Sequence, residues 1–299
     1  MSAPSPRSLP EPNRKWIVEF SRLQLKADRR VDQALEDALE QVDRSLRGLK
    51  GKPGVGARVR ASQLATSRSA LSKIVTQSFR SVKSIVKDEQ SSAASLAESL
   101  LIKEERGIWR ELIPDKTSRG RAILDMQAQA SRQIQATMAR IFQSERPLGA
   151  RIYRSEALAK NQVSRTIDRH IAIGSSAQDM AKDLRALVDP KVSGGVSYRA
   201  KLLARTEINN AFHAQSISDA RERPWISQVR WNLSKSHYEE GCVCEEYARA
   251  EFFGVNEVPL KPHPQCMCSI TPEIPDLSAV MGAFLSGEYG SWAPGSGIV

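Results

Sequence analysis

The sequence has few cysteines and few aromatic residues, and both shortages limit the possible folds. All four cysteines, Cys242, Cys244, Cys266 and Cys268, lie within 27 residues of a 299-residue chain. The rest of the chain therefore cannot carry the disulfide framework of a small secreted domain. Aromatic residues make up only 6% of the chain, which is low for a β-sandwich or barrel but sufficient for helices that pack through Leu, Ile, Val and Ala.

Long apolar runs are also missing. No run of roughly 18 apolar residues occurs, so we expect no membrane span and no membrane partner. The Pro- and Ser-rich start, residues 1–13, lacks the apolar stretch of a secretory signal and is expected to be disordered. We therefore expect assembly in a cytoplasm, where clustered thiols bind metal more often than they form disulfides.

Apolar residues recur at spacings of three and four through most of the chain, which is typical of amphipathic helices. The segment "IPDK" predicts a break in this helical body, residues 14–222, near 113–118. From Trp225 onward, β-branched and aromatic residues predict short strands. The expected fold is mainly α: a long N-terminal helical body, a small α+β cysteine module at 223–276, and a flexible C-terminal tail at 277–299.

Positive charge is concentrated in the first 230 residues. The net charge of the chain is +10, but residues 231–299 carry −6 and the rest carries +16. A basic body with an acidic end suggests two partners or a polyanion nearby, whereas the simpler alternative is a well-solvated helical surface.

The cysteine spacing predicts a metal site. Residues i and i+2 of an extended strand point to the same side, so each C-x-C pair can direct both sulfurs to one point. Two such strands face to face would give four thiolates around one centre, as in a structural zinc site. His263 and His237 are alternative ligands, and free buried thiols or disulfides remain alternatives to a metal.

Motifs of catalysis are absent. The sequence has no H-E-x-x-H, no zinc-deaminase signature, no G-x-S-x-G and no Walker loop. Glu245 and Glu246 adjoin the cysteines, but four cysteine ligands would close the metal to water. We expect no enzyme activity and no catalytic residues. The alternatives are a metal-dependent enzyme acting on nucleic acid or peptide through the Cys/His cluster and, more weakly, a nonspecific DNA-binding protein.

Four segments occur in an informative order: "LLARTEINNAFH", "VRWNLSKSH", Cys-x-Cys-Glu and "KPHPQCMC". In this order the sequence resembles the phage head morphogenesis family, the Mu F-like minor head proteins of tailed bacteriophages and prophages. The resemblance covers about residues 175–272 and departs from the family at Cys242, where many relatives have Asp. The motif positions beside the cysteines are Ala204, Arg205, Thr206, Glu207, Trp231, Ser234, Ser236, His237, His263 and Pro264.

The resemblance implies a minor structural protein of the phage head, present in the host cytoplasm during assembly and in the virion afterwards. It implies a role in procapsid assembly at or near the portal, with an influence on DNA packaging or ejection. The expected partners are the portal protein, the major capsid or scaffolding protein and, nonspecifically, DNA; oligomers would form through assembly. A structural Zn²⁺ is the expected cofactor.

Overall fold

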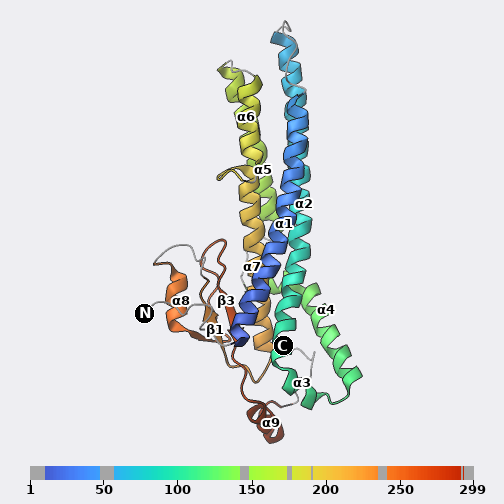
Figure 1. Cartoon of the computed structure of the whole chain (residues 1–299), viewed down its shortest axis with the longest axis vertical. Coiled ribbons are helices and arrows are strands. Elements are labelled where there is room, and N and C mark those ends of the chain that lie inside the picture. The colour runs from blue at the N-terminus through green and yellow to red at the C-terminus, as the bar shows by residue number, and fades with distance from the viewer. Residues whose placement is uncertain are drawn as a thin grey trace. The chain divides into compact units, whose positions relative to one another are not determined.

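The computed structural model describes residues 11–47, 57–141, 148–173, 177–189, 191–234, 241–290 and 292 (Figure 1). The described residues form nine helices and three strands, which confirms the predicted fold class: a long helical region followed by a small part with strands and all four cysteines. The helices are α1 (Glu11–Arg47), α2 (Ala57–Glu104), α3 (Arg106–Leu112), α4 (Lys116–Ile141), α5 (Leu148–Ala172), α6 (Ala177–Val188), α7 (Val196–Glu222), α8 (Val243–Ala250) and α9 (Leu277–Ser286). The strands are β1 (Gln228–Asn232), β2 (Phe252–Gly254) and β3 (Ser269–Pro272).

The chain divides into two compact units. Unit 1 consists of residues 1–25, 88–145 and 206–299, and unit 2 consists of residues 26–87 and 146–205. The sequence predicted one helical body, residues 14–222, with a separate cysteine module after it. The compact units do not follow that boundary, because the start of α1, the end of α2 and most of α7 belong to the same unit as the cysteines.

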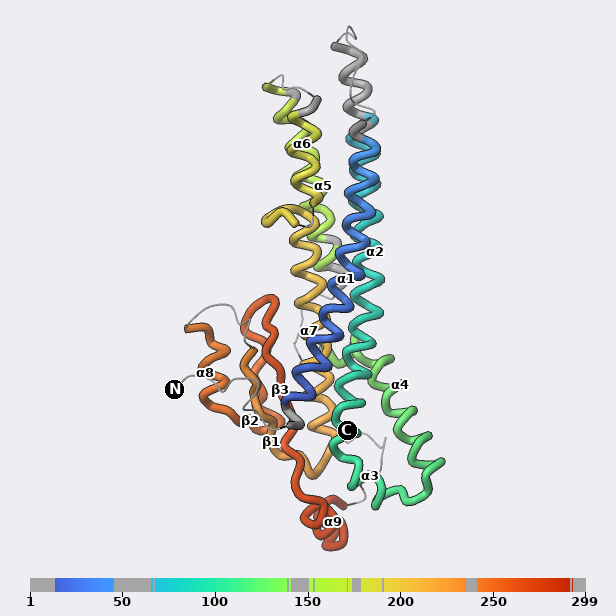
Figure 2. The backbone as a smooth tube through the Cα atoms, viewed as in Figure 1, coloured from blue at the N-terminus to red at the C-terminus, as the bar shows by residue number. Residues whose placement is uncertain are grey.

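Unit 2 is a helical bundle built from parts of α1, α2, α5, α6 and α7, which run alongside one another (Figures 1 and 2). Its buried apolar side chains recur every three or four residues, so each helix turns one apolar stripe inward. The core residues are Val31, Leu35 and Val42 of α1; Leu71, Val75, Phe79, Val82 and Val86 of α2; Ile152, Ala159, Val163 and Ile167 of α5; Met180, Leu184 and Val188 of α6; and Val196, Ala200 and Ala204 of α7.

Aromatic side chains hold the helices of unit 1 together. Phe212 of α7 stacks on Phe20 of α1 with ring centroids 4.3 Å apart, and it meets Trp16 edge-on at 6.0 Å. The indole N–H of Trp16 donates to the Glu104 carboxylate at the end of α2 over 2.6 Å. Aromatic residues are rare in this chain, but here several of them meet in one core.

A three-stranded antiparallel sheet follows α7, in the order β2-β1-β3. In the central strand, Val229 lies opposite both Phe253 of β2 and Pro272 of β3. All four residues of β3 are buried, whereas β2 is half-buried. The sequence predicted strands in this region, and the sheet brings the chain on either side of the cysteines together.

Two smaller predictions differ from the structure. Residues 11–13, expected to be disordered, begin α1, whereas residues 1–10 lie outside the described residues. Residues 277–286, assigned to a flexible tail, form α9 because this segment is apolar and packs in an aromatic cluster. Phe284 of α9 lies 5.8 Å from Trp225 between ring centroids, and Trp292 lies 4.8 Å from Trp225. The predicted break between helices at 113–118 is present, since α3 ends at Leu112 and α4 begins at Lys116.

Within the described residues, we find no helix long and apolar enough to cross a membrane.

Candidate metal centre

The four cysteines and His263 gather at one place in unit 1. Their ligand atoms form two groups, Cys242–Cys244–His263 and Cys244–Cys266–Cys268, and within each group all atoms lie within 4.8 Å of one another. Cys244 belongs to both: its Sγ is 3.6 Å from Cys266 Sγ and 3.2 Å from His263 Nε2. Two sulfurs on one tetrahedral zinc lie about 3.8 Å apart, given a Zn–S bond of about 2.3 Å. The cluster therefore has the size of a single metal site.

Burial differs among the candidate ligands. Cys244, Cys266 and Cys268 are at most 1% exposed, whereas Cys242 and His263 are partly exposed. The Nδ1–H of His263 donates to its neighbour's carbonyl, Pro264 O, over 2.9 Å. That bond leaves the lone pair of the neutral ring on Nε2, which is the atom that faces Cys244.

The first cysteine pair does not lie on a strand, so the prediction of two facing strands is wrong. Cys242 is the N-cap of α8, with extended dihedral angles, and Cys244 lies in the first helical turn. Glu245 and Glu246 favour a helix start here because acidic side chains interact well with the positive end of the helix dipole. The same helix end favours a thiolate. The start of α8 can therefore present these cysteines to a metal, although it is not the strand that the sequence predicted.

The second cysteine pair lies in a loop that precedes β3 and is fixed to α7. Gln265 has a left-handed backbone with φ 60°, which turns the chain just before Cys266. The Gln265 N–H donates to Thr206 Oγ1 over 3.1 Å, and the Asn209 side-chain amide donates to Cys266 O over 3.1 Å. Further back, His213 Nε2 donates to Pro259 O over 3.0 Å. Thr206, Asn209 and His213 recur at i, i+3 and i+7, so one face of α7 holds the loop.

The ammonium of Lys261 lies close enough to the cysteine sulfurs to affect their pKa values. The Lys261 Nζ donates to the carbonyls of Cys266 and Cys268 over 2.9 Å each. A hydrogen bond from the Cys268 thiol and the charge of Lys261 hold the pKa of Cys266 below its usual value. That same bond, followed by burial, raises the pKa of Cys268, and burial raises the pKa of Cys244. One thiolate is thus favoured without a metal, and a second or third needs a cation to offset the added negative charge.

Residues of the W-x-x-S motif surround the same centre. The backbone N–H of Ser234 donates to Cys268 Sγ over 3.5 Å, a contact that supports sulfur ligands in metal sites. Trp231 of β1 meets Tyr247 of α8 edge-on, with ring centroids 5.0 Å apart, and it meets His213 of α7 at 5.7 Å. His237 and Ser236 lie outside the described residues, so the structure places neither beside the cysteines.

Two further motif residues, Arg205 and Glu207, lie on α7 and contact other helices of their own units. Arg205 makes a bidentate pair with Asp28 of α1 in unit 2, at 2.7 and 2.8 Å. Glu207 is fully buried in unit 1, and its backbone carbonyl accepts a bond of 3.4 Å from Gln90 of α2. The partner of Arg205 is therefore on another helix, α1.

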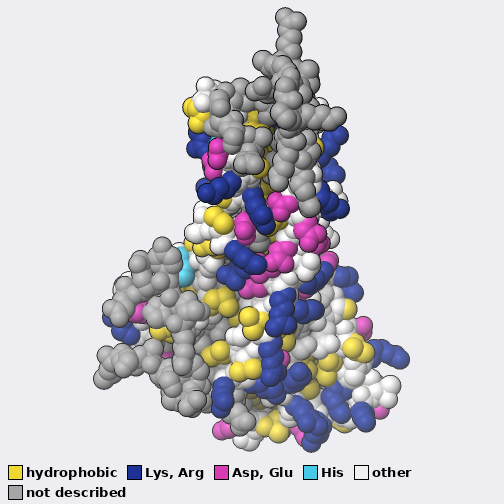
Figure 3. Space-filling view, turned by 45° about the horizontal axis from the view of Figure 1, so that its top comes forward, with side chains coloured by type: hydrophobic (Ala, Val, Ile, Leu, Met, Phe, Trp, Pro, Cys, Tyr) yellow, Lys and Arg dark blue, Asp and Glu magenta, His cyan; other side chains and the backbone are white. Residues whose placement is uncertain are grey.

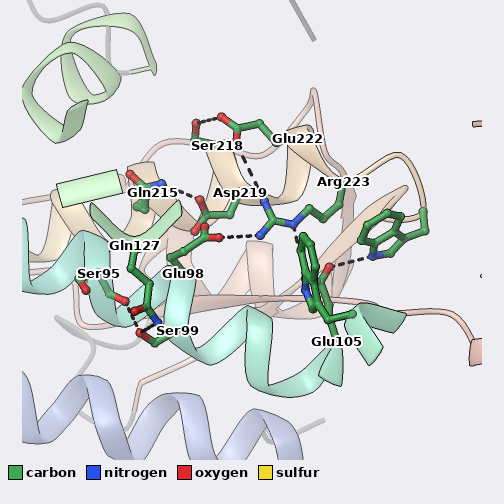
Figure 4. Close-up of polar contacts among 12 residues, drawn as sticks. Ser95, Glu98, Ser99, Glu105, Gln127, Gln215, Ser218, Asp219, Glu222 and Arg223 are labelled. Carbon is green, nitrogen blue, oxygen red and sulfur yellow. Dashed lines mark hydrogen bonds and ion pairs between the residues drawn. The ribbon is translucent and has the colours of Figure 1, made fainter. Parts of the chain in front are cut away.

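A second polar cluster in unit 1 could not be found from the sequence. The Arg223 side chain is 1% exposed; it binds Glu98 of α2 at 2.7 Å and Glu105 at 3.4 Å (Figure 4). Glu105, between α2 and α3, also accepts the indole N–H groups of Trp109 and Trp225 at 2.9 and 2.8 Å. Its members are far apart in the sequence and lack motif spacing, so only the structure reveals the cluster.

Asp219 extends this cluster beside a small cavity. It lies next to Glu98 in Figure 4 and accepts a 2.6 Å bond from the Gln215 amide, its neighbour one turn earlier on α7. Burial, followed by the charge of Glu98, raises the pKa of Asp219 well above its usual value, which favours a shared proton between the two carboxyls. The adjacent cavity of about 40 Å³ has room for water rather than for a substrate. The cluster joins α2, the segment between α2 and α3, and the end of α7 through buried polar contacts.

The chemistry available at the cysteine centre is metal binding. Two groups of three potential ligands share Cys244, and the sulfurs of Cys244, Cys266 and Cys268 are shielded from solvent. Four protein ligands fill a tetrahedral ion and leave no position for water.

Comparison of the chain with protein-family models, curated proteins and solved structures finds no match.

Proposed function

We propose that this chain is a minor head protein of a tailed bacteriophage, acting in head assembly at or near the portal, and that a structural zinc ion stabilises its docking part. The observation that supports this best is the convergence of the four family-like segments on one centre. Thr206, Ser234, Cys244 and the Cys266–Cys268 pair are distant in the sequence but adjacent to the same sulfurs or to the loop that bears them. Trp231 packs on Tyr247 of α8, the helix that bears Cys244. A motif set that builds one structural centre suits a protein that recognises partners.

We assign Cys244, Cys266 and Cys268 as three zinc ligands, with His263 or Cys242 as the fourth. Metal analysis of the purified chain should give one zinc per molecule, and Cys266→Ser should lose it. Cys242→Ser and His263→Asn identify the fourth ligand, because only the variant that lacks it loses the metal. A wild-type protein without stoichiometric zinc contradicts the assignment.

The assembly role is tested by co-expressing the chain with the portal protein of the same phage or prophage and purifying the portal. The chain should co-purify with the portal, and Cys266→Ser/Cys268→Ser should weaken the association because its docking part loosens. Leu285→Ser, at a side chain that is 88% exposed on α9, is the surface control. A portal that never retains the wild-type chain contradicts the assembly role.

Contact with DNA is a second candidate, favoured by the charge of α4. This helix carries Lys116, Arg119, Arg121, Arg132 and Arg140 against a single acid, Asp125. Lys and Arg side chains are also numerous on the face shown in Figure 3. Arg121 and Arg132 are exposed and eleven residues apart, so they share the outer side of the helix. Such a surface fits phosphates without reading bases.

The DNA contact predicts nonspecific binding that weakens steeply with salt. Arg121→Glu/Arg132→Glu should lower the affinity for any duplex and reduce the salt slope by about 2, since each phosphate contact contributes about one. Lys73→Glu/Lys182→Glu, at two exposed positions of unit 2, makes the same change in net charge and is the control. Equal loss in both variants would mean that overall charge, rather than α4, is responsible.

A further inference from the structure

Lys261 lies at the meeting point of three parts of unit 1. Its Nζ donates to the carbonyls of Cys266 and Cys268 over 2.9 Å each, so one ammonium spans the second cysteine pair. The same ammonium lies over the ring of Phe20 of α1, 5.4 Å from the centroid. Phe20 in turn stacks on Phe212 of α7. The side chain is partly exposed, but its charged end is directed to these inner groups.

A Zn²⁺ ion bound to these thiolates would carry a net negative charge, which a nearby cation can offset. Zn²⁺ with three thiolates and a neutral imidazole carries −1, and with four thiolates it carries −2. A buried anion is costly unless an opposite charge or hydrogen-bond donors compensate it. Between Gly241 and Glu273 the only other Lys or Arg is Arg249, which is exposed and binds the Glu245 carbonyl within α8.

The two hydrogen bonds from Lys261 also constrain the backbone of the Cys266–Cys268 segment. An ammonium that binds the carbonyls of residues i and i+2 draws both toward itself and fixes the peptide units that carry the two sulfurs. Asn209 adds a second donor to the Cys266 carbonyl, from α7. The loop therefore presents its cysteines in one conformation before any metal arrives, which lowers the entropy lost on binding.

We infer that Lys261 is a positioning residue of the metal centre: its ammonium clamps the Cys266 and Cys268 carbonyls and offsets the negative charge of the metal–thiolate group. This inference rests on the metal centre proposed above. It assigns a function to a residue outside the cysteine and histidine positions that the sequence singled out. It also links the centre to α1 through Phe20, so the start of α1 should sense whether the metal is bound.

The test measures the affinity of the purified full-length chain for Zn²⁺ and Co²⁺ by competition with a chromophoric chelator. Lys261→Met keeps the stem but removes the charge, and it should weaken binding by about tenfold or more, as for other residues that support metal ligands. Lys261→Arg keeps the charge and should restore most of the affinity. In the Co²⁺ form, the sulfur-to-metal charge-transfer band should shift in Lys261→Met and return in Lys261→Arg.

His213→Gln is the matched control, because the bond from His213 to this loop goes to the carbonyl of Pro259. It should lower stability while retaining metal affinity. Equal affinities of wild type and Lys261→Met, or an equal loss in His213→Gln, would overturn the clamp and leave the metal centre standing. A wild-type chain that binds neither ion would instead overturn the metal centre itself.

Discussion

At the scale of single residues, Arg223 is a buried charge whose partners stabilise unit 1. A buried guanidinium between Glu98 and Glu105 is stable only while its partners remain, because an unpaired charge in this setting cannot reach water. Its cation also lies 5.7 Å from the ring centroid of Trp109. The residue therefore joins α2, α3 and the end of α7.

Arg223→Met should lower the free energy of unfolding by about 3–5 kcal/mol, the usual loss when one partner of a buried ion pair is removed. Urea denaturation of the full chain measures this change. Arg68→Met removes a surface pair with Asp168 and should cost at most about 1 kcal/mol. Adding Glu98→Gln to Arg223→Met should recover part of the loss; a purely additive double variant would speak against the pairing.

Asp219 gives the stability of the protein a pH dependence. Burial and Glu98 raise its pKa, so the folded state binds a proton more tightly than the unfolded state does. The stability that this bound proton contributes is fully present below the ordinary carboxyl pKa of about 4, and it is lost as pH rises through the raised pKa of the folded state. Glu104 acts with the same sign, since burial raises its pKa to about 7.

Thermal unfolding midpoints measured from pH 4 to pH 8 should therefore fall with rising pH more steeply in wild type than in Asp219→Asn. The Asn amide is neutral at every pH and can donate to Glu98 where the proton did. Asp125→Asn, on the exposed side of α4, should leave the slope as it is. Parallel profiles for wild type and Asp219→Asn would exclude a proton held at this carboxyl.

At the scale of elements, the turn between α6 and α7 depends on Gly195, the residue just before α7. A Cβ built there would lie 2.8 Å from the Leu187 carbonyl oxygen and 3.2 Å from that of Ala186, and both are backbone atoms that cannot swing aside. Gly120 of α4 is the opposite case, because a Cβ there would meet nothing within 4 Å. The same substitution should thus have opposite effects just before α7 and inside α4.

Gly195→Ala should destabilise the protein by about 1–3 kcal/mol, in the range found for overpacking. Gly120→Ala should stabilise it by about 0.5–1 kcal/mol, because Gly costs that much in a helix interior. Denaturant midpoints of the two variants against wild type provide the measurement. Stabilisation by Gly195→Ala would show that α7 begins with a looser turn.

At the scale of the whole molecule, the division into two units predicts where loss of metal is felt. The cysteines share unit 1 with the start of α1 and most of α7, whereas no group of candidate ligands lies among the described residues of unit 2. A chelator should therefore loosen unit 1 selectively.

Hydrogen exchange with and without a chelator should show faster exchange at 206–213, 243–250 and 266–272, and also near Phe20 through Lys261. Exchange in the bundle residues 152–167 and 180–188 should be unchanged. Uniform acceleration across both units would mean that the chain unfolds as a single cooperative body. Protection that is insensitive to the chelator would mean that the centre contributes nothing to the fold.

The sequence alone determined the long helical region, the break at 113–118, the strands after Trp225 and the identity of the candidate ligands. Helical periodicity and cysteine spacing are local properties, because neighbouring residues set which face an apolar or thiol side chain occupies. Only the tertiary structure decided the rest: Cys242 and Cys244 begin a helix, one face of α7 holds the loop of Cys266, and Arg223 finds Glu98 and Glu105. The contacts of α7 and of Arg223 join residues from 46 to 125 positions apart, so no local pattern specifies them, and burial in a common core selects them.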